Sequence, residues 1–272
     1  MTDLKGIEFV IFDVETTGLS PYSGDRIVEI AAVKLKDSKI VGRFETMLDP
    51  QREISYEAFS VNGITPEMLS GAPRAEEVLP DIFHFIKNAY LVGHNIKFDL
   101  NFLNNEFVLA GWPPLEDLLT IDTVKMARGL LPQLGRYSLG AVAYSLGMSY
   151  PQKHRAMSDV EMTLGVFQKL LELAEDKKIS DLNLLTSLFG YHPSWQKIQE
   201  GKVDMITEAI FAEHRLNLLY FGTNSGLTSR IVKPQQLIGD GRETVLVGFC
   251  HLRNEERHFR LDRIVQLEKF KG

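Results

Sequence analysis

The chain has 272 residues, of which 44% are hydrophobic and 24% are charged, as in an ordinary globular protein of one large domain or two smaller ones. Its single cysteine, Cys250, excludes an intramolecular disulfide and a cysteine-built zinc site. No apolar run reaches the roughly 18 residues of a membrane span, and the N-terminus lacks a signal-peptide profile, so we expect a cytoplasmic protein with no membrane partner. The net charge of −6 does not indicate nucleic-acid binding.

The first predicted element, residues 9–15 (FVIFDVE), is a buried strand that two carboxylates interrupt. Asp13 and Glu15 are two positions apart, so they point to the same face at the carboxyl end of the strand, where ligands of open α/β sheets bind. A hard cation such as Mg²⁺ or Mn²⁺ would stabilise this pair. The alternative is that the strand ends at Phe12 and that both acids are solvated.

The following segments alternate between strand and helix patterns. Residues 26–48 contain two alternating runs around Asp37 and Ser38, which predicts an antiparallel hairpin. Helices are expected at 75–88, where Pro80 can break or kink the helix, and at 98–111, 137–148 and 158–174. Short strands are expected at 89–95 and 118–124. The α/β pattern therefore predicts a mixed five-stranded sheet flanked by helices and opened by a three-strand meander.

Two more acidic residues lie near predicted helix starts. Asp99 follows a buried strand, with Asn95 as a plausible N-cap, and the helix face around it is otherwise apolar. A carboxylate on such a face is either costly or functional.

The second of these two acidic residues, Asp159, is expected where the helix at 158–174 begins. Ser158 and Glu161 fit a capping box, which places Asp159 in the first turn of that helix. By itself Asp159 can be read as an acid that complements the helix dipole. His154 would lie on the turn before the helix, and a lone histidine there is usually surface decoration.

Together these motifs resemble one family. Asp-x-Glu-Thr-Thr-Gly at 13–18, His-Asn-x-x-Phe-Asp at 94–99 and His-x-x-x-x-Asp at 154–159 are similar to the three motifs of the DnaQ-like, DEDDh-type 3′→5′ exonucleases. This family includes the proofreading exonucleases of bacterial replicative polymerases. The resemblance covers roughly residues 7–174 and implies an RNase H-like fold.

The resemblance implies a two-metal nuclease. Asp13, Glu15, Asp99 and Asp159 would hold two Mg²⁺ or Mn²⁺ ions, and His154 would act as the general base that takes a proton from the attacking water. The product would be a nucleoside 5′-monophosphate released from a 3′ end. The implied partners are single-stranded nucleic acid or the 3′ ends of DNA or RNA, and a DNA polymerase or another replication or repair protein.

The resemblance also implies a set of substrate contacts. The terminal nucleotide would be bound by Thr16, Thr17, Gly18, His94 and Asn95, while Phe98 and Ile64 would pack against bases. Phe98 and Ile64 can equally be plain core residues. Two other functions stay open: an exoribonuclease or short-oligonucleotide degrader, and a non-catalytic nucleic-acid-binding regulator on a vestigial nuclease scaffold.

The last part of the chain resembles a different module, the WYL domain, which implies a small SH3-like β-barrel. The matching positions lie within about residues 203–270 and include Ile206, Ala209, Ile210, Tyr220, Arg230 and Pro234. The naming triplet is Thr244-Val245-Leu246 in this chain, so only the leucine is kept. We expect an exonuclease domain at 1–176, a linker at 177–202 and an accessory domain at 203–272.

One segment of the accessory domain, HLRNEERHFRLDR at 251–263, suggests a nucleic-acid contact. Phe259 and Leu261 alternate with polar residues, which predicts a strand with one buried face. The other side would carry a basic cluster of Arg253, Arg257, Arg260 and Arg263. Because Glu255, Glu256 and Asp262 lie among these arginines, the alternative is a network of weak surface ion pairs. A rigid spacer or oligomerisation module is the other alternative.

Overall fold

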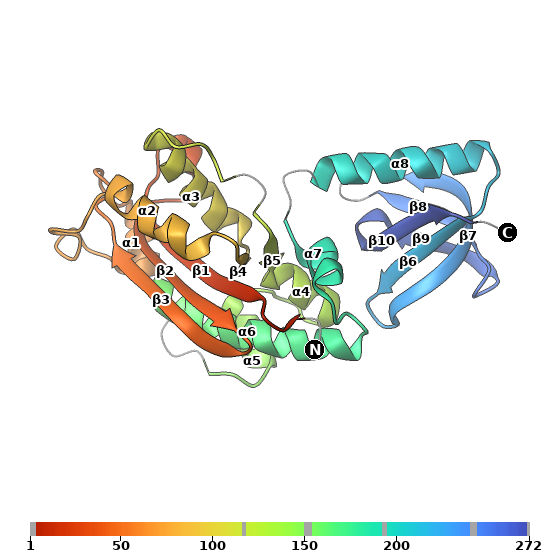
Figure 1. Ribbon diagram of the computed structural model, residues 1–272, viewed down its shortest axis with the longest axis horizontal. Coiled ribbons are helices and arrows are strands. Elements are labelled where there is room, and N and C mark those ends of the chain that lie inside the picture. Colours follow the sequence, from red (N-terminus) through yellow and green to blue (C-terminus); the bar gives the residue numbers. More distant parts are fainter. Residues whose placement is uncertain (1–3, 116–117, 150–153, 192–194, 240–243, 271–272) are drawn as a thin grey trace. The chain divides into compact units, whose positions relative to one another are not determined.

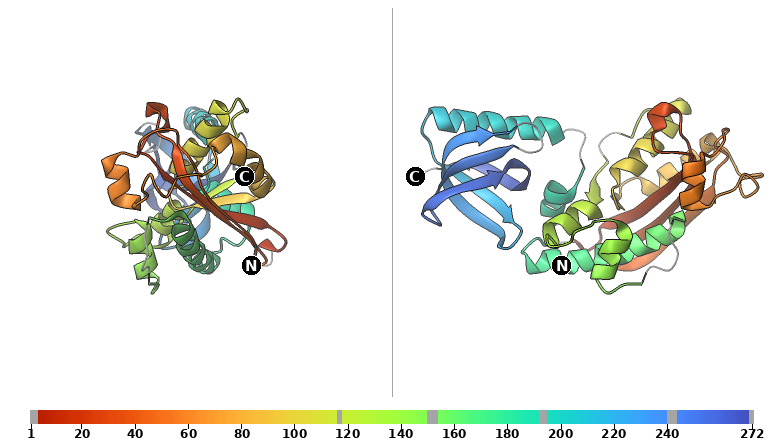
Figure 2. Two further views of the ribbon diagram at one scale, coloured as in Figure 1. Left: turned by 90° about the vertical axis from the view of Figure 1, so that its left-hand side faces the viewer. Right: turned by 180° about the vertical axis from the view of Figure 1, so that it is seen from behind.

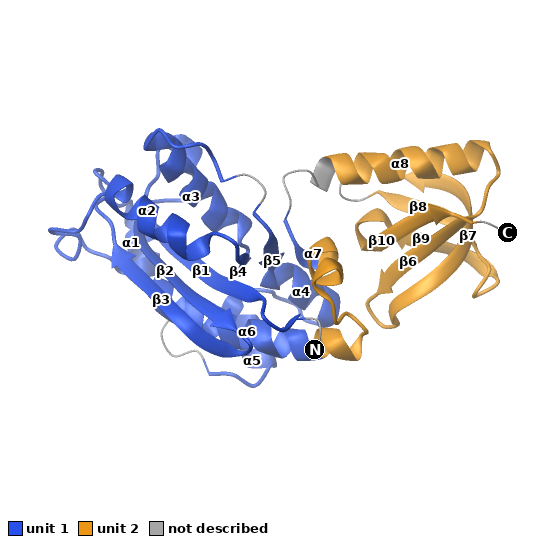
Figure 3. Cartoon of the chain, in the orientation of Figure 1, with its two compact units in different colours: residues 1–172, 189–191 blue, residues 173–188, 192–272 orange. Residues whose placement is uncertain are grey.

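The computed structural model describes residues 4–115, 118–149, 154–191, 195–239 and 244–270. The chain divides into two compact units (Figure 3). Unit 1 consists of Met1–Glu172 and Phe189–Tyr191, and unit 2 of Leu173–Leu188 and His192–Gly272. The stretch expected as a linker contains the helix α7 (Leu182–Phe189) and the start of α8 (Trp195–Phe211). The domain boundaries expected at 176 and 202 stay predictions.

Unit 1 is built on a five-stranded mixed sheet of order β3-β2-β1-β4-β5 (Figure 1). The first three strands form an antiparallel meander, and β4 and β5 run parallel to β1. The strands are β1 (Glu8–Thr16), β2 (Ile27–Lys36), β3 (Lys39–Met47), β4 (Tyr90–Gly93) and β5 (Thr120–Asp122). The mixed five-stranded sheet and the opening meander predicted from the sequence are confirmed.

The two faces of β1 pack against different helices. Val10, Phe12 and Val14 belong to a buried cluster with residues of α2 (Ala75–Ile86) and α3 (Lys97–Leu109), which cover one face of the sheet (Figures 1 and 2). On the other face the Phe9 ring lies 5.3 Å from the Phe167 ring of α6 (Ala156–Asp176). Since strand residues alternate, Asp13 and Glu15 lie on the α6 face with Phe9.

Several boundaries differ from the sequence expectation. β1 continues through Glu15 to Thr16, so the alternative in which the strand ends at Phe12 is wrong. Pro80 lies inside α2 without ending that helix. β5 has only three residues, and α4 (Thr123–Leu130) follows at once. The remaining helices of unit 1 are η2 (Pro21–Ser23), α1 (Tyr56–Asn62) and α5 (Leu139–Ser145).

The turn between β2 and β3 confirms the predicted hairpin. Asp37 has a φ of 48° and Ser38 has a φ of 62°. Two consecutive positive φ angles are the signature of a type I′ turn, whose twist matches that of the flanking strands.

Unit 2 contains a five-stranded antiparallel sheet of order β10-β6-β7-β8-β9, with α8 packed on it. Its strands are β6 (Leu216–Gly222), β7 (Gly226–Ile238), β8 (Val245–Cys250), β9 (Glu255–Arg260) and β10 (Ile264–Lys269). Ile206 and Ala209 of α8 share a core with Leu218 and Val232. Over the described residues β9 and β10 remain the edges of an open sheet, so the expected SH3-like barrel is not confirmed.

Among the residues that the structure describes, no helix has the length and apolarity needed to span a membrane.

Candidate active site

A pocket of about 610 Å³ opens at the carboxyl end of β1. Ten of the twelve nuclease residues predicted from the sequence line it: Asp13, Glu15, Thr16, Gly18, His94, Asn95, Phe98, Asp99, His154 and Asp159. Thr17 and Ile64 are not part of its lining. The three motifs therefore converge on one site, although they are separated by up to about 140 residues in the sequence.

The first motif supplies two carboxylates from β1. Glu15 is 9% exposed and is the register partner of Glu29 on β2. Burial raises the pKa of Glu15 to about 8, with further contributions from the charges of Asp159 and Glu29. Burial also raises the pKa of Asp13 well above its ordinary value, and the neighbouring carboxylates of Asp99 and Asp159 add to this effect.

The second motif brings Asp99 from the first turn of α3. Its Oδ1 accepts a hydrogen bond of 3.1 Å from the backbone N–H of Val14 in β1. Burial raises the pKa of Asp99 well above its ordinary value, and this hydrogen bond opposes the rise. The predicted N-cap is wrong, because Ile96 holds that position. Asn95 lies before it with a φ of 70° and donates its backbone N–H to Asp122 Oδ1.

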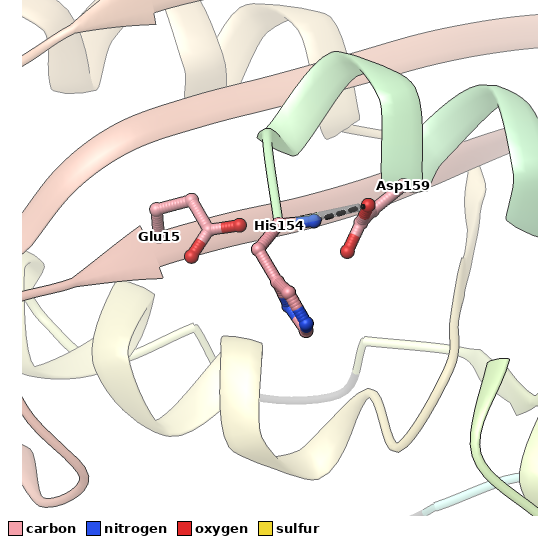
Figure 4. Close-up of side chains that lie close together, drawn as sticks. All are labelled: Glu15, His154 and Asp159. Carbon is pink, nitrogen blue, oxygen red and sulfur yellow. Dashed lines mark hydrogen bonds between the residues drawn. The ribbon is translucent and has the colours of Figure 1, made fainter. Parts of the chain in front are cut away.

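The third motif supplies His154 and Asp159 from the beginning of α6. His154 precedes the helix with a φ of 58°, so its predicted place on the turn is confirmed. Its backbone N–H donates to Asp159 Oδ1 over 3.1 Å (Figure 4). The predicted capping box is wrong: α6 begins at Ala156, so Ser158 lies inside the helix, and Glu161 pairs with Arg43 of β3. Asp159 is nevertheless in the first turn.

The donor set fits divalent cations. Glu15, His154 and Asp159 each offer a ligand atom, and these atoms lie within 4.8 Å of one another (Figure 4). Asp13 and Asp99 line the same pocket. The raised pKa values of Asp13, Glu15 and Asp99 mean that ionising all of these buried carboxylates is costly without added positive charge. Carboxylate oxygens are the preferred ligands of Mg²⁺ and Mn²⁺.

The Thr16–Gly18 turn has two residues that line the pocket and one that does not. Thr17 is fully buried, and its hydroxyl group accepts the backbone N–H of Arg26 over 3.0 Å. Its backbone carbonyl accepts the N–H of Ser55. Thr17 therefore shapes the turn from inside, while Thr16 and Gly18 face the pocket. A β-carbon at Gly18 would overlap the carboxylate of Asp25, so the absence of a side chain is required by packing within the turn.

The remaining predicted substrate residues have different surroundings. His94 lines the pocket, but its Nδ1 lies 2.9 Å from Thr123 Oγ1 and its Nε2 lies 2.8 Å from the carbonyl oxygen of Tyr137. Burial lowers the pKa of His94, which favours the neutral ring. The Tyr137 carbonyl can only accept a hydrogen bond, so Nε2 is the nitrogen that carries the proton in this arrangement. Phe98 lines the pocket and also packs against Phe102. Ile64 is fully buried with Val28 and Leu69, so the structure places it in the core.

Sequence reasoning missed three polar residues beside the site. Glu29 is 1% exposed on β2 and accepts hydrogen bonds from Arg155 and from the backbone of Ala156. Asp122 holds the backbone of Asn95, and Asn62 donates from its side-chain nitrogen to the carbonyl oxygen of Thr16. The sequence could have indicated Glu29, since this residue interrupts the apolar run RIVEIAAV as Asp13 interrupts the apolar run of its own strand.

The predicted basic cluster of unit 2 is already partly paired. Arg257 lies 2.8 Å from Glu255, and Arg260 makes a two-pronged contact with Asp262. Phe259 and Leu261 are buried as predicted, but β9 ends at Arg260 and a 3₁₀ turn, η4 (Leu261–Arg263), follows. The single strand expected across this segment is therefore wrong. Arg253 is exposed, and Arg263 is half-buried in η4.

The fold and the site together define a class, namely an α/β protein with a carboxylate-lined pocket at the end of the central strand of a mixed sheet. The profile of the Exonuclease family matches residues 10–167, and that of the WYL domain matches residues 201–269. The chain belongs to the Exonuclease family, as a DnaQ-like 3′→5′ exonuclease domain followed by a WYL domain.

Proteins that are similar to this chain include the PolC-type DNA polymerases of two bacteria. The chain is 38% identical over 243 residues to the DNA polymerase III PolC-type of Clostridium perfringens, covering 89% of this chain. It is 34% identical over 241 residues to that of Oceanobacillus iheyensis, covering 88% of this chain. In both cases it spans only 17% of the relative.

Solved structures share the fold. Exonuclease I of E. coli in complex with an oligonucleotide matches with a TM-score of 0.59 at 18% identity, over 89% of this chain and 55% of that one. A 3′-exonuclease that recognises a histone mRNA stem-loop matches with a TM-score of 0.55 at 19% identity, over 63% and 66% of the two chains.

Proposed function

We propose that this protein is a metal-dependent, DEDDh-type 3′→5′ exonuclease that releases nucleoside 5′-monophosphates from the 3′ ends of DNA in the cytoplasm. The observation that carries the proposal is the convergence of Asp13, Glu15, Asp99, His154 and Asp159 on one pocket. All five positions hold residues competent for the chemistry, which argues against the alternative of a non-catalytic regulator.

The four carboxylates would hold two Mg²⁺ or Mn²⁺ ions. Such ions, when bound, stabilise the negative charge on the attacking and leaving oxygens of an in-line displacement. Buried acids that raise one another's pKa suit this task, because the cations favour their ionised forms. Asp99 would be aligned by Val14, whose N–H occupies one of its oxygens.

His154 would act as the general base. Its side chain is exposed, lines the pocket and lies beside Glu15 and Asp159 (Figure 4). A neutral imidazole ring can accept a proton from the attacking water. The hydrogen bond from the backbone of His154 to Asp159 couples the position of the base to that of a carboxylate.

The nucleotide at the 3′ end would lie along the rest of the pocket lining. Thr16, Gly18, Asn95 and Phe98 are the other predicted substrate residues that line it. Both nitrogens of His94 lie within hydrogen-bond distance of protein oxygens. His94 would therefore contact the nucleotide through the carbon atoms of its ring and not through a hydrogen bond. Thr17 would act only through the shape of the turn, and Ile64 would take no part because it lies in the core.

We propose DNA as the preferred substrate because the matched segments of the PolC-type relatives belong to DNA polymerases. The same comparison supports our proposal of a role on 3′ ends beside a DNA polymerase, with a repair protein as the other proposed partner. The fold is also shared by an exonuclease that recognises mRNA, so RNA is the alternative that the experiment must separate. Unit 2, as an SH3-like module, would bind the single strands that unit 1 digests.

The proposal is tested by digesting matched single-stranded DNA and RNA oligonucleotides, each labelled at the 5′ or the 3′ end, with Mg²⁺, Mn²⁺ or EDTA. We expect 5′-labelled DNA to give a ladder that shortens from the 3′ end, with mononucleotides released from 3′-labelled DNA and no cleavage in EDTA. Asp159→Asn is the inactive control. Faster digestion of RNA would replace the substrate assignment, and no digestion of either polymer would refute the activity.

A further inference from the structure

A partly buried ion pair between Glu29 of β2 and Arg155 lies beside the active site. Arg155 donates from Nε to Oε2 of Glu29 over 3.1 Å and from Nη2 to Oε1 over 2.7 Å. The Glu29 side chain is 2% exposed, while that of Arg155 is 33% exposed. This two-pronged geometry fixes the direction of both side chains, which a single contact between point charges does not.

Glu29 also caps the helix that carries Asp159. Its Oε2 accepts the backbone N–H of Ala156, the first residue of α6, over 3.0 Å. A carboxylate at a helix N-terminus satisfies an N–H group without an intrahelical partner and complements the helix dipole. This cap comes from a different element of the fold, so it fixes where the first turn of α6 lies on the sheet.

The same carboxylate is in register with the first catalytic motif. Glu29 and Glu15 are directly opposed in the β1–β2 ladder, so their side chains share one face. Like charges at opposed positions are destabilising, and Arg155 offsets that repulsion at Glu29. Arg155 in turn lies between His154 and Asp159 in the sequence. One ion pair therefore joins β2, the His154 turn and α6 at the pocket.

We infer that the Glu29–Arg155 ion pair positions His154 and Asp159 against Glu15, and that its loss impairs both metal binding and turnover. This inference rests on the proposed nuclease function. Neither residue needs to touch the substrate, because both act through the residues that they hold in place. Displacement of a reacting group by about 1 Å can cost about 10²-fold in rate, so a small shift of the turn suffices.

The test compares Glu29→Gln, Arg155→Gln, Arg155→Lys and the double variant Glu29→Gln/Arg155→Gln with the wild-type full chain. The matched control is Arg43→Gln, which removes another contact between the sheet and α6, the exposed Arg43–Glu161 pair. Mn²⁺ affinity is measured by calorimetry, kcat and KM are measured on a single-stranded oligonucleotide, and folding is checked by thermal melting. All assays are run at a temperature at which every variant is folded.

We expect each single Gln variant to have an Mn²⁺ affinity and a kcat that are about 10- to 100-fold lower than those of the wild type. This is the usual effect of removing a group that orients metal ligands. KM should change less than kcat. Arg155→Lys, which keeps the charge, should retain more activity than Arg155→Gln. The double variant should regain thermal stability, because neither charge is left buried and unpaired, but not kcat. Arg43→Gln should behave as the wild type.

Wild-type kcat and Mn²⁺ affinity in the folded single variants would overturn the inference, as would a return of kcat together with stability in the double variant. Failure of the proposed function looks different, because the wild type itself would then digest no oligonucleotide. In that case the Mn²⁺ titration still decides whether the ion pair organises the carboxylates.

Discussion

The backbone N–H of Val14 and the carboxylate of Asp99 form a 3.1 Å hydrogen bond that joins the first and second acidic motifs. Val14 lies between the two acidic residues of β1, so this bond brings Asp99 to the part of the strand that carries Asp13 and Glu15. The bond uses one oxygen of Asp99 and explains how a residue 85 positions away joins the cluster. The main chain of β1 is thus itself part of the site.

Replacement of a carboxylate should abolish most of the activity without unfolding the protein. We expect Asp13→Asn or Asp159→Asn to lower kcat by at least about 10³-fold, the scale of losing electrostatic stabilisation of the transition state. Asp81→Asn, at an exposed position on α2, is the control and should leave kcat unchanged. Single-turnover digestion of a 5′-labelled oligonucleotide measures the effect, and a decrease below about tenfold would contradict the role of these carboxylates.

His154→Ala should lower kcat by about 10²- to 10⁴-fold, the usual contribution of a positioned general base. Because the His154 side chain is exposed, the space that it leaves is open to solvent, and added imidazole should restore part of the activity. Imidazole should not rescue Asp159→Asn, which serves as the matched control. If His154→Ala instead fails to bind Mn²⁺ and shows no rescue, His154 is a metal ligand and not the base.

Without divalent cations the protein should become less stable as the pH rises. The pKa of Glu15 is raised from 4.5 to about 8 in the folded state, so between these values the folded protein holds a proton that the unfolded chain has released. The free energy of unfolding therefore falls with increasing pH across this window, by on the order of a few kcal/mol.

Thermal melts in EDTA at pH 5 and pH 8 measure this effect. We expect the melting temperature of the wild type to fall more between the two values than that of Glu15→Gln, which has no proton to release at this position. Added Mn²⁺ should reduce the wild-type fall at pH 8, since it binds the ionised carboxylates of the folded state. Equal falls in the wild type and in Glu15→Gln would contradict the raised pKa.

Unit 2 should contribute to the binding of long single strands through its arginines. Replacing Arg257 and Arg260 with Ala should reduce the salt slope of binding by roughly 0.7 for each phosphate group that the variant no longer neutralises. The structure sets a matched control, Lys233→Ala, which removes a basic residue that is paired with Glu213 in the same unit. Fluorescence anisotropy between low and high salt measures the slope. An unchanged slope would favour the spacer or oligomerisation role.

Much of unit 1 could be predicted because its signals are local. Alternation along β1 places Asp13 and Glu15 on one face, and the two alternating runs around Asp37 and Ser38 predict the antiparallel hairpin, whose turn type the structure adds. The motif spacing places His154 on the turn before α6. These features depend on residues a few positions apart, which share a strand, a turn or one helix face.

The errors arise where distant residues decide the outcome. Ser158 has the sequence of an N-cap, but Glu29, far away in the sequence, accepts the N–H of Ala156, and α6 begins two residues earlier. Asn95 likewise gives its backbone N–H to Asp122 instead of capping α3 with its side chain. For Ile64 the sequence left a base contact and a core position equally open, and its packing with Val28 favours the core. No local pattern reports a partner on another strand.

The β1–β2 ladder also contains an irregularity with a consequence for chain length. Glu15 pairs with Glu29, but Thr16 pairs with Ile27, so Val28 is an extra residue on β2 and is fully buried. Removing or adding one residue at this bulge would turn Ile27 to the opposite face and break its N–H contact with Glu106. The Asp37–Ser38 turn, by contrast, lies at the exposed end of the same hairpin. A tag or inserted loop is therefore compatible with the hairpin tip. At the bulge, by contrast, the number of residues fixes the register of β2 against β1 and so must be kept.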